Sequence, residues 1–126
     1  MYLDNRIKVG CTSCGTFLMA DMYTNLRPIN GFGGCIIPGL KQLGDIDDIL
    51  AGIAPRPYLE TSGDFTSNEE LERVHRKAKS YYSELGLNEH YQTIAYGAGH
   101  MFRTDMRQLS YEWFDRWLRK PMPSSF

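Results

Sequence analysis

Residues 67–87 constrain the fold of this chain more than any other segment. Ser67-Asn68-Glu69-Glu70 has the S-x-x-E form of a capping box, in which the serine oxygen and the glutamate carboxylate each satisfy a backbone N–H at a helix start. Apolar residues then continue at helical spacing at Leu71, Val74, Ala78, Tyr81, Tyr82 and Leu85. Gly86 followed by Leu87 has the form of a left-handed C-cap with its hydrophobic contact. Strand-like runs at 58–61 and 90–96 flank this helix, which predicts a parallel crossover unit.

The rest of the chain continues the alternation of strands and helices. Residues 6–11 alternate polar and apolar side chains and predict a strand. A loop rich in Gly, Pro and Asn follows to residue 44, with a turn of helix around 17–23. Asp45 then caps a short helix that the prolines at 55 and 57 end, and the last helix is expected from about 105 to 118. The predicted fold class is α/β, with about three parallel strands and crossover helices in residues 1–120 and a tail at 121–126.

Composition excludes several classes of protein. The chain has 126 residues, 42% of them hydrophobic, and a net charge of −1, which predicts one globular domain with no electrostatic attraction to nucleic acid. No apolar stretch approaches the roughly 20 residues of a membrane-spanning helix. Residue 1 is not followed by the basic and apolar regions of a signal peptide. We therefore expect a cytoplasmic protein that binds neither membrane nor nucleic acid, although a signal upstream of residue 1 would not be visible.

The three cysteines, Cys11, Cys14 and Cys35, do not have the spacing of a disulfide scaffold and are expected to be reduced thiols. Cys11-Thr12-Ser13-Cys14 matches C-x-x-C, but a redox pair requires a helix N-terminus after a strand and a lowered thiol pKa. A structural zinc site requires four ligands, and no second closely spaced pair completes one among the remaining candidates, Cys35, His75, His90 and His100. The sequence therefore predicts no metal and no cofactor.

Polar residues between glycines follow two of the predicted strands. Gly63 and Asp64 come after the strand at 58–61, and Gly97-Ala98-Gly99-His100 comes after the strand at 90–96. Ligands of open parallel sheets bind outside the carboxyl ends of the strands, and glycines let the backbone turn sharply there. These two segments are the expected site of chemistry.

Seven segments that carry a resemblance occur in a fixed order along the chain: Leu3-Asp4-Asn5-Arg6-Ile7-Lys8-Val9, Ile37-Pro38-Gly39-Leu40, Gly44-Asp45-Ile46-Asp47-Asp48-Ile49, Ile53-Ala54-Pro55-Arg56-Pro57, Glu60-Thr61-Ser62-Gly63, Gly97-Ala98-Gly99-His100-Met101-Phe102 and Tyr111-Glu112-Trp113-Phe114-Asp115-Arg116-Trp117-Leu118. With this order and spacing, nearly the whole chain resembles the C-terminal half of an α/β-hydrolase of the acetyl xylan esterase or dienelactone hydrolase-like kind. The resemblance implies a partial α/β-hydrolase fold and a carboxylic ester substrate with a small acyl group.

The resemblance also implies roles for individual residues. His100 would be the general base, and an acid after the strand at 58–61 would fix its tautomer. The family usually places that acid three residues after the glycine, where this chain has Thr66. Asp64 is the nearest carboxylate and our choice, with Glu69 and Glu70 as alternatives, although capping also explains Glu70. The other two histidines, His75 and His90, are expected to be packed or solvated.

The nucleophile decides between the remaining hypotheses. The chain has no Gly-x-Ser-x-Gly motif, and the resemblance places the family's serine before residue 1. The first hypothesis is therefore a fragment of a serine hydrolase that is inactive alone. In a rival alignment, Cys11-Thr12-Ser13-Cys14-Gly15 forms the elbow and Ser13 is the nucleophile of a small active esterase. A third hypothesis is a non-catalytic module that associates with a second copy through the exposed edge of its first strand. A redox protein is the most distant alternative.

Overall fold

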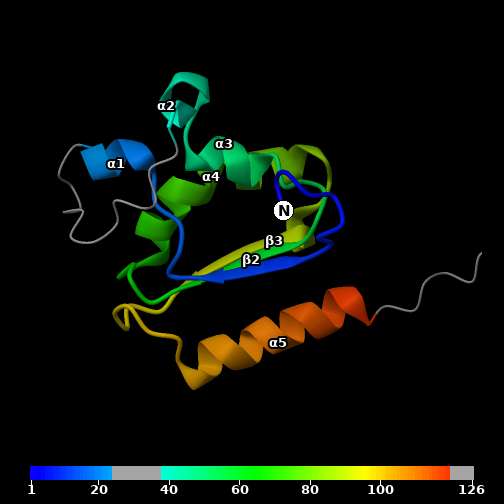
Figure 1. Cartoon of the computed structure of the whole chain (residues 1–126). Helices are drawn as coiled ribbons and strands as arrows, with labels where there is room; N and C mark the ends of the chain where they lie inside the picture. The colour runs from blue at the N-terminus through cyan, green and yellow to red at the C-terminus, as the bar shows by residue number, and fades with distance from the viewer. Residues whose placement is uncertain (24–37, 120–126) are drawn as a thin grey trace, which may run out of the picture.

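A computed structural model describes residues 1–23 and 38–119 (Figure 1). Part of the predicted loop, residues 24–37 with Cys35, and the predicted tail at 121–126 lie outside these residues. The strands are β1 (Gly10–Ser13), β2 (Tyr58–Ser62) and β3 (Tyr91–Ala95). The helices are α1 (Met19–Tyr23), α2 (Leu40–Leu43), α3 (Ile46–Ala51), α4 (Asn68–Glu84), α5 (Thr104–Leu118) and the 3-10 turn η2 (Asn88–His90).

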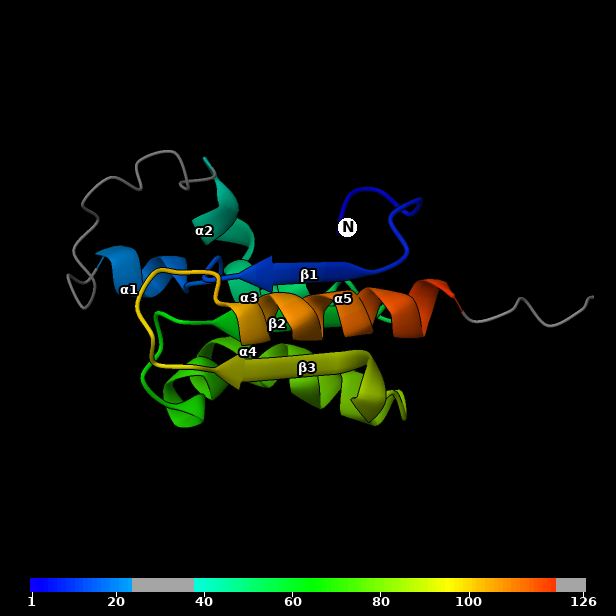
Figure 2. The same ribbon diagram turned by 90° about the horizontal axis from the view of Figure 1, so that it is seen from below.

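The three strands form one parallel sheet in the order β1-β2-β3. Thr12 is in register with Glu60, and Glu60 is in register with Thr93. Figures 1 and 2 show α5 on one face of this sheet and α3 with α4 on the other. The predicted α/β class with parallel strands and crossover helices is confirmed. None of the described helices has the length and apolarity needed to cross a bilayer.

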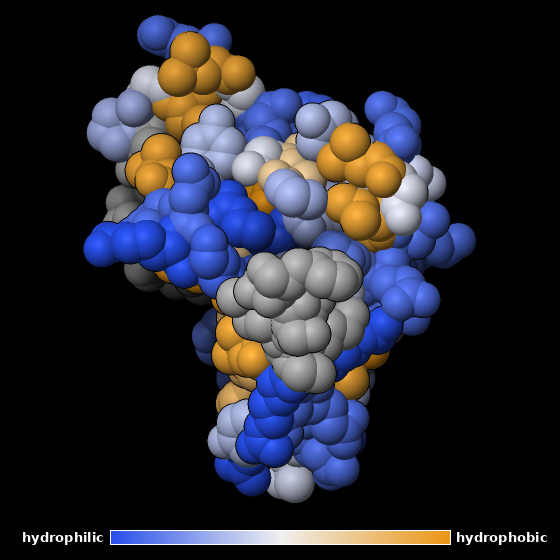
Figure 3. Space-filling model, turned by 90° about the vertical axis from the view of Figure 1, so that its right-hand side faces the viewer, coloured by the Kyte–Doolittle hydropathy of each residue, from blue (hydrophilic) through white to orange (hydrophobic). Residues whose placement is uncertain are grey.

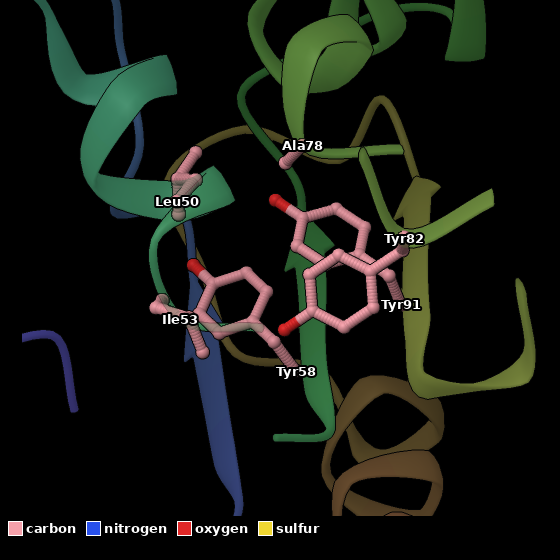
Figure 4. Packing of buried hydrophobic residues seen from close by; sticks show 6 residues of the cluster. All are labelled: Leu50, Ile53, Tyr58, Ala78, Tyr82 and Tyr91. Atoms are coloured by element: carbon pink, nitrogen blue, oxygen red, sulfur yellow. The ribbon is translucent and has the colours of Figure 1, made fainter. Parts of the chain in front are cut away.

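The core lies on both faces of β2, whose five residues are all buried. On the α3–α4 face, a cluster packs around three tyrosine rings; its members are Leu50, Ile53, Tyr58, Ala78, Tyr82 and Tyr91 (Figure 4). On the α5 face, Val9, Leu59 and Trp113 form a second cluster. Burying both faces fits the pattern of parallel sheets, which helices cover on each side.

The exposed apolar residues form no continuous surface in the view of Figure 3. That view shows the end of the molecule away from the carboxyl ends of the strands, and its orange residues stand in separate groups among hydrophilic ones. Scattered apolar residues of this kind are ordinary for a folded protein surface. This face gives no indication of a binding site.

The caps of α3 and α4 differ from the expectation in one respect. Asp45 and Asp48 form a complete capping box at α3. At α4, Ser67 accepts the Glu70 N–H as predicted, at 3.2 Å, but the Glu70 carboxylate binds the N–H and hydroxyl of Thr66. Two donors on one residue attract the carboxylate better than the single N–H of Ser67. The left-handed cap at Gly86 is confirmed, with a φ of 70°.

Residues before β1 are irregular, whereas the sequence predicted a strand from residue 6. The Arg56 guanidinium explains this difference, because its Nη1 donates to the carbonyl oxygens of Met1 at 2.7 Å and Asp4 at 3.0 Å. By binding these carbonyls, the guanidinium holds the first residues of the chain in turns. The strand begins only at Gly10, where the backbone N–H reaches the carbonyl of Pro57.

Candidate active site

The loops that follow β2 and β3 meet at the carboxyl edge of the sheet, toward the left in Figures 1 and 2. Asp64 lies on the first loop and His100 on the second, and His100 Nδ1 is 3.0 Å from Asp64 Oδ2. A carboxylate can only accept, so the Nδ1 nitrogen is the donor of this hydrogen bond. The two residues that the sequence predicted as acid and base are therefore paired.

Glycines allow the two loops to approach this closely. Gly99 N–H donates to the Gly63 carbonyl at 2.9 Å, and Gly97 N–H donates to the Phe65 carbonyl at 3.0 Å. A Cβ atom on Gly63 would lie 2.1 Å from the Gly99 carbonyl oxygen, so no larger residue fits there without moving backbone. Gly97 and Gly99 both have positive φ, at 58° and 79°, which side-chain-bearing residues rarely adopt. These backbone bonds fix the distance between Asp64 and His100.

The two members of the pair differ in exposure. The Asp64 side chain is 14% exposed, whereas the His100 side chain is 68% exposed. The acid is thus sheltered and the imidazole faces solvent. With its proton on Nδ1, the ring has a free lone pair on Nε2, which is the tautomer that a general base requires.

The alternative acids occupy other positions. Glu70 binds Thr66, as described above, and Glu69 is exposed in the first turn of α4. Thr66, three residues after Gly63, carries no carboxylate. Among the three candidate acids, the hydrogen bond to His100 is made by Asp64. The geometry therefore favours Asp64, which is one residue after the glycine.

Ser13, the alternative nucleophile, ends β1 in extended conformation. Its Oγ lies 3.8 Å from Cys14 Sγ, and within the described part of the chain it makes no hydrogen bond to His100. The sharp corner occurs one residue later, because Cys14 has a φ of 55°. An elbow presents its nucleophile at that corner, and here the corner carries a buried thiol. This geometry does not favour Ser13 as the nucleophile.

Cys14 is the site residue that the sequence reasoning missed. Its Sγ accepts the Gly63 N–H at 3.2 Å. One ligand atom each from Cys14, Asp64 and His100 lie within 4.8 Å of one another. Cys14 directly follows β1, and the carboxyl ends of parallel strands share one edge, so the topology was the available signal.

The C-x-x-C pair is divided between two surroundings. Cys11 Sγ donates to Ser110 Oγ on α5 at 3.2 Å, whereas Cys14 faces the loops of the site. Burial raises the pKa of the Cys11 thiol, which is opposite to what a redox cysteine needs. Both thiols are free. This arrangement disfavours the redox hypothesis.

The other two histidines have structural contacts. His75 is fully buried on α4, where Tyr91 Oη lies 2.7 Å from Nδ1 and Thr16 Oγ1 lies 3.1 Å from Nε2. Burial lowers the pKa of His75 to about 3. His90 Nδ1 lies 2.8 Å from the Pro55 carbonyl. Packed roles for both residues agree with the expectation.

A buried carboxyl group on β2 was not predicted. Glu60 is fully buried and binds the hydroxyls of Tyr58 and Thr12. Burial raises the pKa of Glu60, opposed by these hydrogen bonds. An open groove of about 580 Å³ lies beside the same hydroxyls, along the outer edge of β1, and its lining includes Leu3, Ile46 and Ile49. The run Tyr58-Leu59-Glu60-Thr61 predicted a strand but gave no sign that the glutamate side chain would be buried.

Comparison of the chain with protein-family models, with curated proteins and with solved structures finds no match.

Proposed function

We propose that this chain is the acid–base part of an α/β-hydrolase-type serine hydrolase that acts on a small carboxylic ester. The observation that carries the proposal is the 3.0 Å hydrogen bond between His100 Nδ1 and Asp64 Oδ2 at the carboxyl edge of a parallel sheet. Asp64 is sheltered and His100 is exposed, as the orienting acid and the working base of a triad need to be.

In this proposal His100 Nε2 takes the proton of a serine hydroxyl as that oxygen attacks the ester carbonyl, and later returns a proton to the leaving group. Asp64 holds the ring and stabilises the imidazolium that forms between these steps. The serine is supplied by a segment outside these 126 residues. Serine and base act as a unit, so the chain alone is expected to hydrolyse esters negligibly.

The outer edge of β1 is the place where such a segment would join. Within residues 1–23 and 38–119, β1 pairs only with β2, so the backbone groups on its other side remain available for a further strand. The apolar groove along this edge adds a surface for packing. A strand added there parallel to β1 would bring its own carboxyl end to the edge that holds His100.

The test is hydrolysis of p-nitrophenyl acetate. We expect the coding sequence adjacent to this chain's to encode a strand and a Gly-x-Ser-x-Gly motif. When that segment is joined to or mixed with this chain, the ester should be hydrolysed. His100→Ala and Asp64→Ala should abolish this hydrolysis, and the control His90→Ala should keep it. Brisk turnover by the chain alone that Ser13→Ala abolishes would instead establish the small esterase. Adjacent coding sequence without such a motif would count against the proposal.

A second candidate is a non-catalytic module that dimerises, favoured by the same open edge of β1. Two copies related by a two-fold axis could pair β1 with β1. Light scattering distinguishes the candidates, because this module is a dimer at high concentration. A chain that stays monomeric until the serine-bearing segment is added would favour the hydrolase proposal.

A further inference from the structure

We propose that Cys14, Asp64 and His100, which the three strand ends bring together, form a binding site for a zinc ion. This inference goes beyond the proposed hydrolase function and does not depend on it. Each residue comes from a different strand end, so the site exists only in the folded sheet. The sequence showed no such site, because the three residues are separated along the chain by dozens of others.

The donor set suits zinc. A thiolate, an imidazole nitrogen and a carboxylate oxygen are the three side-chain groups that bind Zn²⁺ in proteins, with bonds of about 2.3, 2.0 and 2.1 Å. A tetrahedral ion with these bonds sets its ligand atoms about 3.3 to 3.6 Å apart. The atoms here lie within 4.8 Å of one another, and the Asp64–His100 pair is at 3.0 Å. Small side-chain rotations are therefore enough to enclose an ion.

The surroundings of the cluster support metal binding in two ways. Gly63 donates its backbone N–H to Cys14 Sγ at 3.2 Å, and such a donor stabilises the negative charge of a thiolate ligand. Gly63 also accepts the Gly99 N–H, so the loops carrying Asp64 and His100 are fixed before any ion arrives. A preformed site loses little conformational entropy on binding.

The arrangement has a sheltered side and an open side. Cys14 is buried, with a relative exposure of 5%, while the His100 side chain is 68% exposed. Three protein ligands leave the fourth position of a tetrahedral ion on the open side for a water molecule. Open fourth positions of this kind are typical of catalytic or regulatory zinc sites rather than structural ones.

Zinc binding and the base role of His100 exclude each other. When the ion binds His100 Nδ1, the ring changes tautomer, so that the Nδ1 proton is lost and Nε2 is protonated instead, and the thiol proton of Cys14 passes to solvent. An imidazole bound to metal is no longer available as the oriented base of a triad. Zinc is therefore expected to inhibit any ester hydrolysis that uses His100.

The test is titration of the full chain with Co²⁺, followed by displacement with Zn²⁺. Cobalt bound to a thiolate gives a near-ultraviolet charge-transfer band that cobalt on carboxylates or imidazoles lacks. We expect a saturable band that Zn²⁺ abolishes. Cys14→Ser should remove the band, and His100→Gln should weaken cobalt binding by at least about tenfold.

Matched controls are available on the same chain. Cys11→Ser, Cys35→Ser and His90→Gln should keep both the band and the affinity. His100 is exposed, so His100→Gln is expected to fold normally even if Cys14→Ser does not, and far-ultraviolet circular dichroism checks this. Binding without a thiolate band, a band that survives Cys14→Ser, or a band lost in Cys11→Ser or Cys35→Ser would overturn the proposal. Affinity unchanged in His100→Gln would do the same.

Discussion

His75 and His100 show how one residue type takes two opposite roles in a small sheet. His75 lies inside the α4 layer, fully buried, and both ring nitrogens have a hydroxyl partner. His100 lies at the edge of the sheet, two-thirds exposed, with one nitrogen on Asp64. The first ring is held neutral by its surroundings, and the second is oriented but left free to accept a proton.

The surroundings of the two histidines differ in the charge of the hydrogen-bond partner and in burial, and not in whether the ring is hydrogen-bonded. His75 is paired with the neutral hydroxyls of Tyr91 and Thr16, and its burial disfavours the charged form of the ring. His100 is paired with the Asp64 carboxylate, which orients the ring. Stability should therefore depend on His75, and chemistry on His100.

The largest effect is expected from His75→Ala. This substitution leaves a cavity and removes the partner of the buried hydroxyls of Tyr91 and Thr16. We expect a loss of about 3 kcal/mol or more in the free energy of unfolding. Urea denaturation measures it, with His90→Ala as the matched control. A loss below about 1 kcal/mol would show that His75 is not a core residue.

Gly63→Ala should affect the loops that carry Asp64 and His100. The new Cβ would lie 2.1 Å from the Gly99 carbonyl oxygen, so the two loops must separate. We expect a loss of about 1–3 kcal/mol in the free energy of unfolding, together with loss of the hydrogen bond between His100 and Asp64. Denaturation measures the first effect, and the downfield resonance of the His100 Nδ1 proton reports the second. Gly15→Ala is the control, since its Cβ would meet no atom closer than 3.8 Å.

The lowered pKa of His75 predicts a dependence of stability on pH. The unfolded chain protonates this ring below about pH 6.5, whereas the folded protein does so only near pH 3. Between these values the unfolded state binds more protons, so stability falls as pH falls, by up to about 1.4 kcal/mol per pH unit. The raised pKa of Glu60 acts in the opposite direction as pH rises above its usual value. The difference between wild type and His75→Gln isolates the histidine contribution, and equal slopes for both proteins would contradict the assignment.

His100→Ala should have the smallest effect on stability. Its side chain is mostly exposed, and surface ion pairs contribute little, so we expect a change within about 0.5 kcal/mol. The same variant should abolish any hydrolysis that the complemented protein shows. Thermal denaturation and the ester assay measure the two effects separately. A large destabilisation would mean that His100 has a structural role like that of His75.

The helix–strand alternation of this fold could be predicted because local signals marked the elements. Asp45 and Ser67 are N-caps as predicted, Gly86 is the left-handed C-cap, and the strands at 58–61 and 90–96 exist with small shifts. The predicted start of the first strand, residue 6, was wrong. The alternation at 6–11 does not reveal that Arg56 binds the carbonyls of Met1 and Asp4 and holds the residues before β1 in turns. Contacts over such a distance leave no periodic pattern in the sequence.

The candidate site was predictable only in part. Asp64 and His100 were found because glycines after strands indicate a turn at the carboxyl edge of a sheet. Cys14 was missed because it was considered together with Cys11 as a motif, although the two thiols face different elements. Glu60 was missed because nothing near it in sequence shows that Tyr58 and Thr12 bind its carboxyl group. The surroundings of both residues are set by contacts that form only in the folded sheet.

The parallel order β1-β2-β3 has a consequence for how the molecule assembles. β2, α4 and β3 follow one another directly along the chain, whereas β1 must join β2 across the long segment that contains α1, α2 and α3. Closing that longer loop costs more chain entropy before any contact compensates for it. We expect the β2–α4–β3 unit to form first and β1 to dock onto it last, so that Cys14, which directly follows β1, is the last of the three residues to reach the site.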